Sequence, residues 1–241
     1  MLTRTARQAE VTRNPVLERQ LWQVELAHDL PDVPVLLETL LQLDLEVQEP
    51  CVDLRAMSQL VLSDLGATVQ ILRLAGREYG NEEGCPTRIE DCISDLGVHA
   101  CLEAVSAQVV ARNSRYHSIT ETWAHSREIA QYSKLVAEEM PEVNPEKAYL
   151  AGLLHAIGLL PGVLGWYGSE AASADSALAG FKIARKWSLS PFVVEFFGEM
   201  YHAGCTSRWQ EIVRKAHRRA ARSSIHCPFE KDMSPLLQRV V

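Results

Sequence analysis

The chain has 241 residues, 47% of them hydrophobic, which suits a globular protein with a substantial core and disfavours both disorder and a membrane class. Its net charge of -7 disfavours general nucleic-acid binding, which usually needs a basic surface. No apolar run approaches the roughly 20 residues that span a bilayer, and the N-terminus has no secretory pattern. We therefore expect a cytoplasmic protein that contacts neither membrane nor nucleic acid.

The first half of the chain is predicted to be a bundle of short helices. A leucine-rich stripe over residues 36–43 follows Pro31 and Pro34, which suit a helix entry. Asp53 is the predicted N-cap of the next helix. A third apolar run is expected to stop near Gly76 or Gly80.

Two capping boxes predict further helix starts. Thr87 with Glu90 is expected to open a helix that Gly97 ends or kinks. Ser118 with Glu121 is expected to open a long helix that ends at Pro141. No alternating strand pattern is present.

The second half contains the apolar helix that carries His155, with Pro145 in its first turn. A loop is expected over residues 165–175, then helices over residues 176–187 and 191–202, and a basic helix over residues 210–223. We predict an all-α fold of two packed helical bundles, divided near Ser114. The expected parts are an N-terminal extension (1–29), an N-terminal bundle (30–114), a C-terminal bundle (115–225) and a tail (226–241).

Six short motifs follow one another along residues 30–222. They are Leu30-Pro31-Asp32-Val33-Pro34, Ser63-Asp64, Ile71-Leu72-Arg73-Leu74-Ala75, Ile89…Ile93…Leu96-Gly97, Trp123-x-His125-Ser126 and Gly152-Leu153-Leu154-His155-x-Ile157-Gly158. Their order, which is more specific than any one of them, resembles that of the HDOD family, a degenerate relative of the HD and HD-GYP metal-dependent phosphohydrolases. The resemblance implies that the C-terminal bundle is HD-domain-like.

The chain departs from the family at important positions. Gly76-Arg77 stands where Asn-Ser is usual, and Ala156 replaces the metal-binding Asp that follows the motif His. His217 stands at the place where HD enzymes carry their last metal Asp. A carboxylate can donate oxygen to a divalent cation, whereas a methyl group cannot. We therefore expect no catalytic residues, no cofactor and no metal.

Four histidines are the candidates for a vestigial pocket: His125, His155, His202 and His217. The resemblance brings His125 and His155 together in the bundle core, and the favoured interpretation is a pair of buried, hydrogen-bonded imidazoles inherited from an enzyme. His202 and His217 could complete an all-histidine cluster, although a surface position is the more common explanation for each. The six cysteines form no CxxC pair and are expected to be reduced thiols.

The basic helix carries a candidate face for an anion or a partner, made of Arg214, Lys215, Arg218, Arg219 and Arg222. A solvated surface is the commoner reason for such a charge run. The resemblance implies a regulatory module for bacterial signal transduction, with a protein partner or a small anionic ligand. The alternative is a residual metal-dependent phosphohydrolase that acts on nucleotides or other phosphate esters.

Overall fold

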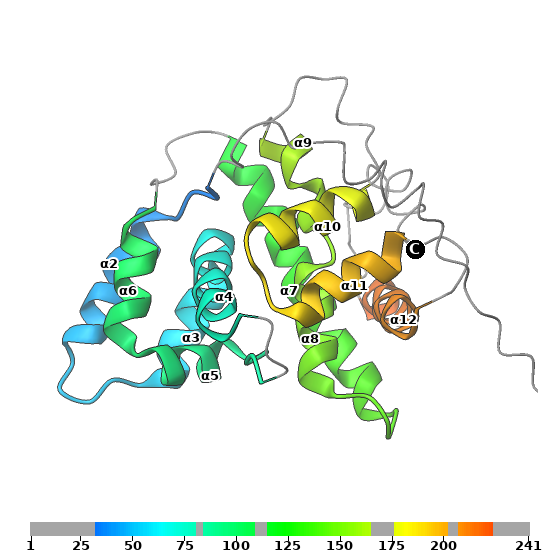
Figure 1. The fold of residues 1–241 in the computed structure, drawn as a ribbon, viewed down its shortest axis with the longest axis horizontal. Coiled ribbons are helices and arrows are strands. Elements are labelled where there is room, and N and C mark those ends of the chain that lie inside the picture. The colour runs from blue at the N-terminus through cyan, green and yellow to red at the C-terminus, as the bar shows by residue number, and fades with distance from the viewer. Residues whose placement is uncertain (1–31, 81–83, 109–114, 165–175, 202–206, 224–241) are drawn as a thin grey trace, which may run out of the picture. The chain divides into compact units, whose positions relative to one another are not determined.

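The protein is all-α in the part of the chain that the structure, a computed structural model, describes: residues 32–80, 84–108, 115–164, 176–201 and 207–223. Helices alone make up the regular structure there (Figure 1), which confirms the predicted fold class. The chain divides into two compact units, Met1–Leu30 and Pro31–Val241, and only the second contains described residues. The predicted division near residue 114 lies in an undescribed stretch and stays a prediction, as does the loop over 165–175.

The first five labelled helices pack against one another (Figure 1). They are α2 (Leu37–Gln48), α3 (Leu54–Ser63), α4 (Leu65–Tyr79), α5 (Ile89–Leu96) and α6 (Val98–Ser106). Asp53 caps α3 as predicted, since its carboxylate accepts hydrogen bonds from two backbone N–H groups. Gly97, with φ +88°, separates α5 from α6. This conformation suits a residue without a Cβ.

Two local predictions for these and the following helices are wrong. Arg88, not Thr87, is the N-cap of α5, and no side chain caps that helix. Ser118 lies inside helix α7, so it does not open it. The helix predicted over the leucine stripe is present as α2, in which Leu43 is buried while Leu37 and Leu41 are more than half exposed.

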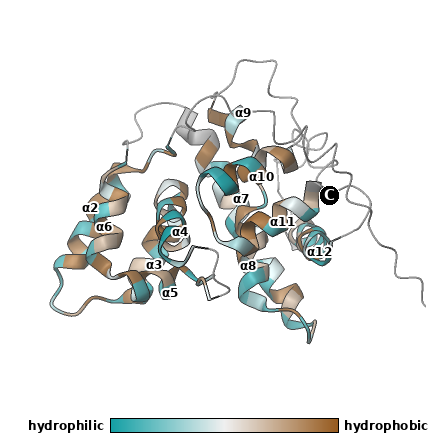
Figure 2. Cartoon of the chain, viewed as in Figure 1, coloured by the Kyte–Doolittle hydropathy of each residue, from teal (hydrophilic) through white to brown (hydrophobic). Residues whose placement is uncertain are grey.

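The remaining helices form the part of the fold that holds the candidate site. They are α7 (Arg115–Glu138), α8 (Pro145–Leu154), the short 3-10 helix η1 (Ile157–Leu159), α9 (Leu160–Leu164), α10 (Ser176–Lys186), α11 (Pro191–Tyr201) and α12 (Arg208–Ser223). Helix α8 packs along α7, and α12 packs against both. A core cluster at their junction includes Val136, Ala148 and Ile212. In Figure 2 the other helices of this group carry brown, apolar residues, whereas α12 is mostly hydrophilic.

The expectation that no apolar run approaches the length needed to span a bilayer is wrong for one stretch. Pro145–Leu164 has 20 residues and the composition of a membrane-spanning helix, but 67% of its most apolar window is buried. The helix also ends at Leu154, before a turn and η1. The stretch is therefore a core element in this fold.

Contacts join the two groups of helices. The indole N–H of Trp123 in α7 donates to the backbone carbonyl of Leu62 in α3, at 3.0 Å. Gly76 in α4 lies so close to the backbone carbonyl of Ser188 that an added Cβ would overlap it. Glycine at residue 76, where the family usually has asparagine, is therefore explained by close packing against the Ser188 carbonyl.

Candidate functional site

Three imidazoles meet where α7, the end of α8 and α12 come together. The ring centroid of His155 lies 5.8 Å from that of His125 and 5.0 Å from that of His217, and the His125–His217 distance is 5.1 Å. One ring nitrogen from each residue lies within 4.8 Å of the other two. The expected pairing of His125 with His155 is confirmed.

His155 occupies the C-cap of α8 instead of the helix interior. The last carbonyls of a helix lack partners within it, and the His155 side chain supplies one. Its Nδ1 lies 2.7 Å from the carbonyl oxygen of Gly152. Because a carbonyl can only accept, Nδ1 carries the proton and Nε2 has the free lone pair. The ring is 4% exposed, and its Nε2 has no hydrogen-bond partner among the described groups.

Gly152 also allows the close approach of α8 to α7. A Cβ at this position would lie 2.8 Å from the Cα of Ala130 and 2.6 Å from Oγ of Ser133. The motif that contains Gly152 did not predict this packing role. A glycine within an apolar helix is the sequence signal that could have indicated it, because such a glycine often marks a close contact.

His217 lies on the side of α12 that faces the core. Ile212, Val213, Ala216 and Ala220 of the same helix are buried, and His217 is half-buried next to them. Of the two alternatives left open for His217, a place in the histidine cluster and a surface position, the structure therefore supports the cluster. Residues 212, 213, 216, 217 and 220 share one helical face, so burial of the apolar members carries the histidine inward. His202 lies outside the described residues.

The environment favours neutral imidazoles. Burial, followed by the neighbouring His217 and His125, holds the pKa of His155 well below its usual value. Burial and then His125 lower the pKa of His217 to about 4. The metal-ligating groups that cluster here within the described chain are three histidines, with no carboxylate among them. Ala156, in place of the family Asp, is buried.

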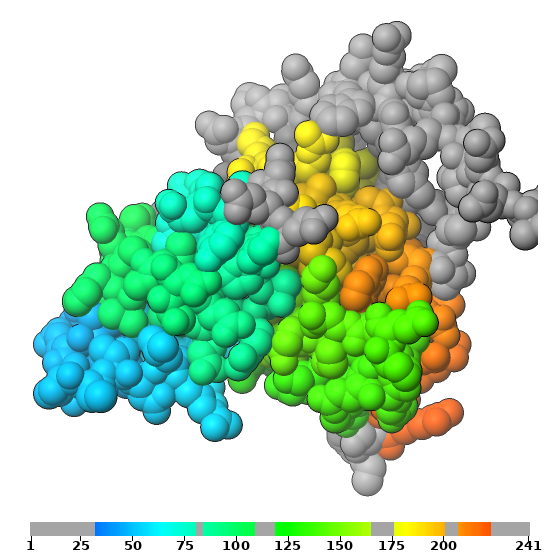
Figure 3. Space-filling view, turned by 60° about the horizontal axis from the view of Figure 1, so that its bottom comes forward, coloured from blue at the N-terminus to red at the C-terminus, as the bar shows by residue number. Residues whose placement is uncertain are grey.

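The basic helix is confirmed, but its cationic face is divided. Arg219 pairs with Glu139 at the end of α7 (2.6 Å), and Lys215 pairs with Glu211 (2.8 Å). Because Arg219 forms an ion pair with the bundle, the expectation of a fully solvated face is wrong for this residue. In Figure 3 the orange surface of α12 borders the green surface of α7 and α8.

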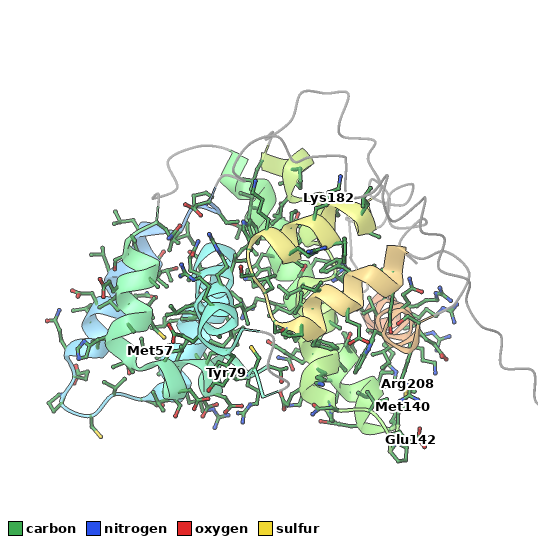
Figure 4. All side chains as sticks on the ribbon, viewed as in Figure 1. Met57, Tyr79, Met140, Glu142, Lys182 and Arg208 are labelled. Carbon is green, nitrogen blue, oxygen red and sulfur yellow. The ribbon has the colours of Figure 1, made fainter. Side chains whose placement is uncertain are left out.

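The other three members of the predicted face form no ion pair with the described residues. Arg218 and Arg222 are exposed, while Arg214 is half-buried, with a buried Nε that has no hydrogen-bond partner among the described groups. At the other end of α12, Arg208 lies beside Glu142, which follows α7 (Figure 4), with 3.5 Å between Nη2 and Oε2. The helix is therefore anchored to the bundle at both ends.

Comparison with known proteins agrees with this arrangement. The model of the HDOD domain matches residues 30–164, more than half of the chain. The chain belongs to the HDOD family. The model of the HD domain matches residues 122–239, which include the three clustered histidines of this HDOD protein.

Among solved structures, that of a response regulator shares the fold of this HDOD protein. The MmoQ response regulator from Methylococcus capsulatus superposes with a TM-score of 0.59 at 18% identity, over 86% of this chain and 92% of that one. An HDOD domain protein of unknown function from Geobacter sulfurreducens matches with a TM-score of 0.36 at 19% identity, over 93% and 86% of the two chains. A protein from Shewanella amazonensis, described provisionally as a metal-dependent phosphohydrolase, gives 0.38 at 16% identity, over 93% and 88%.

Proposed function

We propose that this HDOD protein is a non-catalytic regulatory module of a cytoplasmic signalling pathway, which acts by binding a partner. The proposal rests on the residues that lie where α7, α8 and α12 meet. Three imidazoles cluster there without a carboxylate, and a buried alanine stands beside His155.

Hydrolysis of a phosphate ester in an HD-type centre needs a cation that polarises the phosphate and generates hydroxide from water. Carboxylate oxygens suit magnesium and manganese, and they are missing from the positions where the family pattern has them. Loss of Asp at both residue 156 and residue 217 therefore supports a role in binding over a role in catalysis.

Hydrolysis assays test the absence of catalysis. The parent protein is incubated with Mn²⁺ and either bis(p-nitrophenyl) phosphate or a cyclic dinucleotide, beside a variant that carries both Ala156→Asp and His217→Asp. We expect no turnover by the parent, and Mn²⁺ binding only by the variant, since it regains two oxygen donors. Manganese-dependent hydrolysis by the parent at many turnovers per molecule would overturn the proposal and favour the residual enzyme.

The exposed Arg218 and Arg222 on α12 are the proposed contact for an acidic protein surface. They stand out in a chain of net charge -7, and complementary charge steers association between proteins. Exposed charge pairs are screened over about 8 Å at physiological ionic strength, so binding should weaken as salt rises.

A partner isolated from the native cell by pull-down allows this surface to be tested. The variant with Arg218→Glu and Arg222→Glu should bind it at least tenfold more weakly than the parent at low salt. Arg77→Glu, a charge reversal at an exposed residue of α4, is the matched control and should leave affinity unchanged. Equal affinity of the double variant and the parent, with no salt dependence, would remove α12 from the interface.

A further inference from the structure

The cluster of His125, His155 and His217 contains two buried ring nitrogens that lack a hydrogen-bond partner among the described residues. They are the Nε2 atoms of His155 and His217, both inaccessible to solvent. A buried polar atom without a partner destabilises a folded protein. Two such atoms within one cluster make it a candidate site for an additional group.

The arrangement orients these lone pairs for a common ligand. The hydrogen bond from His155 Nδ1 to the Gly152 carbonyl fixes the tautomer and presents Nε2 to the cluster. Histidines that bind metals are held in the same way, with the second ring nitrogen donating to a carbonyl or a carboxylate. The three elements that supply the rings, α7, α8 and α12, pack directly on one another.

The donor set does not fit the metal centre that the HD relatives imply. An HD-type centre combines histidines with two aspartates, and the oxygen ligands favour hard cations such as magnesium and manganese. Here Ala156 offers no ligand atom and His217 offers nitrogen in place of oxygen. Imidazole suits zinc, cobalt, nickel and copper instead.

We propose that His125, His155 and His217 bind a single divalent cation of the zinc class. The three nitrogens lie within 4.8 Å of one another, a separation that small side-chain rotations can reduce to the roughly 3.4 Å of a tetrahedral site with Zn–N bonds of about 2.1 Å. Three protein ligands leave one position of the tetrahedron for water or another small ligand.

The cation would join α12 to α7 and to the end of α8. Because α12 carries the exposed Arg218 and Arg222, metal occupancy would fix the helix that presents this basic surface. This inference is independent of the proposed function, since a metal can be bound with or without hydrolysis. Metal binding and phosphate-ester turnover are measured separately, so failure of one can be told from failure of the other.

The test uses the full chain, prepared without a histidine tag and stripped of metal with a chelator. Calorimetric titration with Zn²⁺ should give one site per chain, and Co²⁺ should give visible absorption bands typical of a nitrogen-ligated, low-coordinate ion. Mg²⁺ should give no heat at the same concentrations. Bound zinc should also raise the melting temperature, because a ligand that binds only the folded state stabilises it.

Two variants locate the site. His217→Ala should lower zinc affinity at least tenfold, whereas His99→Ala, at an exposed histidine of α6, should leave it unchanged. His217→Gln, a neutral side chain of similar size, gives the same comparison if the alanine variant does not fold by circular dichroism. No zinc or cobalt binding by the folded parent would refute the proposal, as would equal binding by the parent and the folded His217 variants.

Discussion

Asp64 is predicted to be the more important of two helix-capping aspartates in the N-terminal group of helices. The side chain is 1% exposed. Its Oδ1 accepts from the N–H of Ala67 at 3.1 Å and caps α4, while its Oδ2 accepts from the N–H of Leu36 at 2.7 Å. The second bond ties the start of α2 to the start of α4. Burial raises the pKa of this carboxyl, against the lowering effect of its hydrogen bonds.

The cost of Asp64→Ala follows from these contacts. Loss of the cap costs about 1 kcal/mol. Leaving the part-buried N–H of Leu36 without its acceptor adds about 1–2 kcal/mol, so the free energy of unfolding should fall by about 2–3 kcal/mol.

Asp53 provides the matched control, because it caps α3 through Arg55 and Ala56 but is exposed and makes no long-range hydrogen bond with the described residues. Asp53→Ala should therefore cost about 1 kcal/mol. Urea denaturation followed by circular dichroism at 222 nm measures both variants. If Asp64→Ala costs no more than Asp53→Ala, the tie between α2 and α4 contributes nothing to stability and the reasoning is refuted.

Two further predictions concern the site. The lowered pKa of His217, about 4 against 6.5 when unfolded, means that the unfolded chain takes up a proton first as the pH falls. The contribution of this residue is complete above pH 6.5 and should decrease by about 1–2 kcal/mol between pH 7 and pH 5. Denaturation of metal-free parent and His217→Gln measures it, and equal pH dependence would contradict it. Gly152→Ala should cost about 1–3 kcal/mol by forcing α8 from Ala130 of α7, while Gly162→Ala, which meets no atom within 4 Å, should be nearly neutral in thermal unfolding.

The helices and the meeting of His125 with His155 could be predicted from the sequence, because both follow from apolar periodicity and from motif order. For His217 the sequence left two alternatives, a pocket position and a surface position. Its burial depends on which side of α12 faces α7, and the sequence of a helix with many charged residues does not decide this. The capping box predicted at Thr87 does not form, since Arg88 is the N-cap of α5 and no side chain caps that helix. Short local patterns specify the first residue of a helix only weakly.

The contact of Gly76 with the Ser188 carbonyl restricts which residues can occupy position 76. Ser188 has φ +53°, an uncommon conformation for a residue with a side chain, and it lies in the turn between α10 and α11. A single mutation of Gly76 to asparagine would place a Cβ on that carbonyl. Any side chain at residue 76 therefore requires an accompanying shift of the turn, so the identity of residue 76 and the conformation of Ser188 constrain each other.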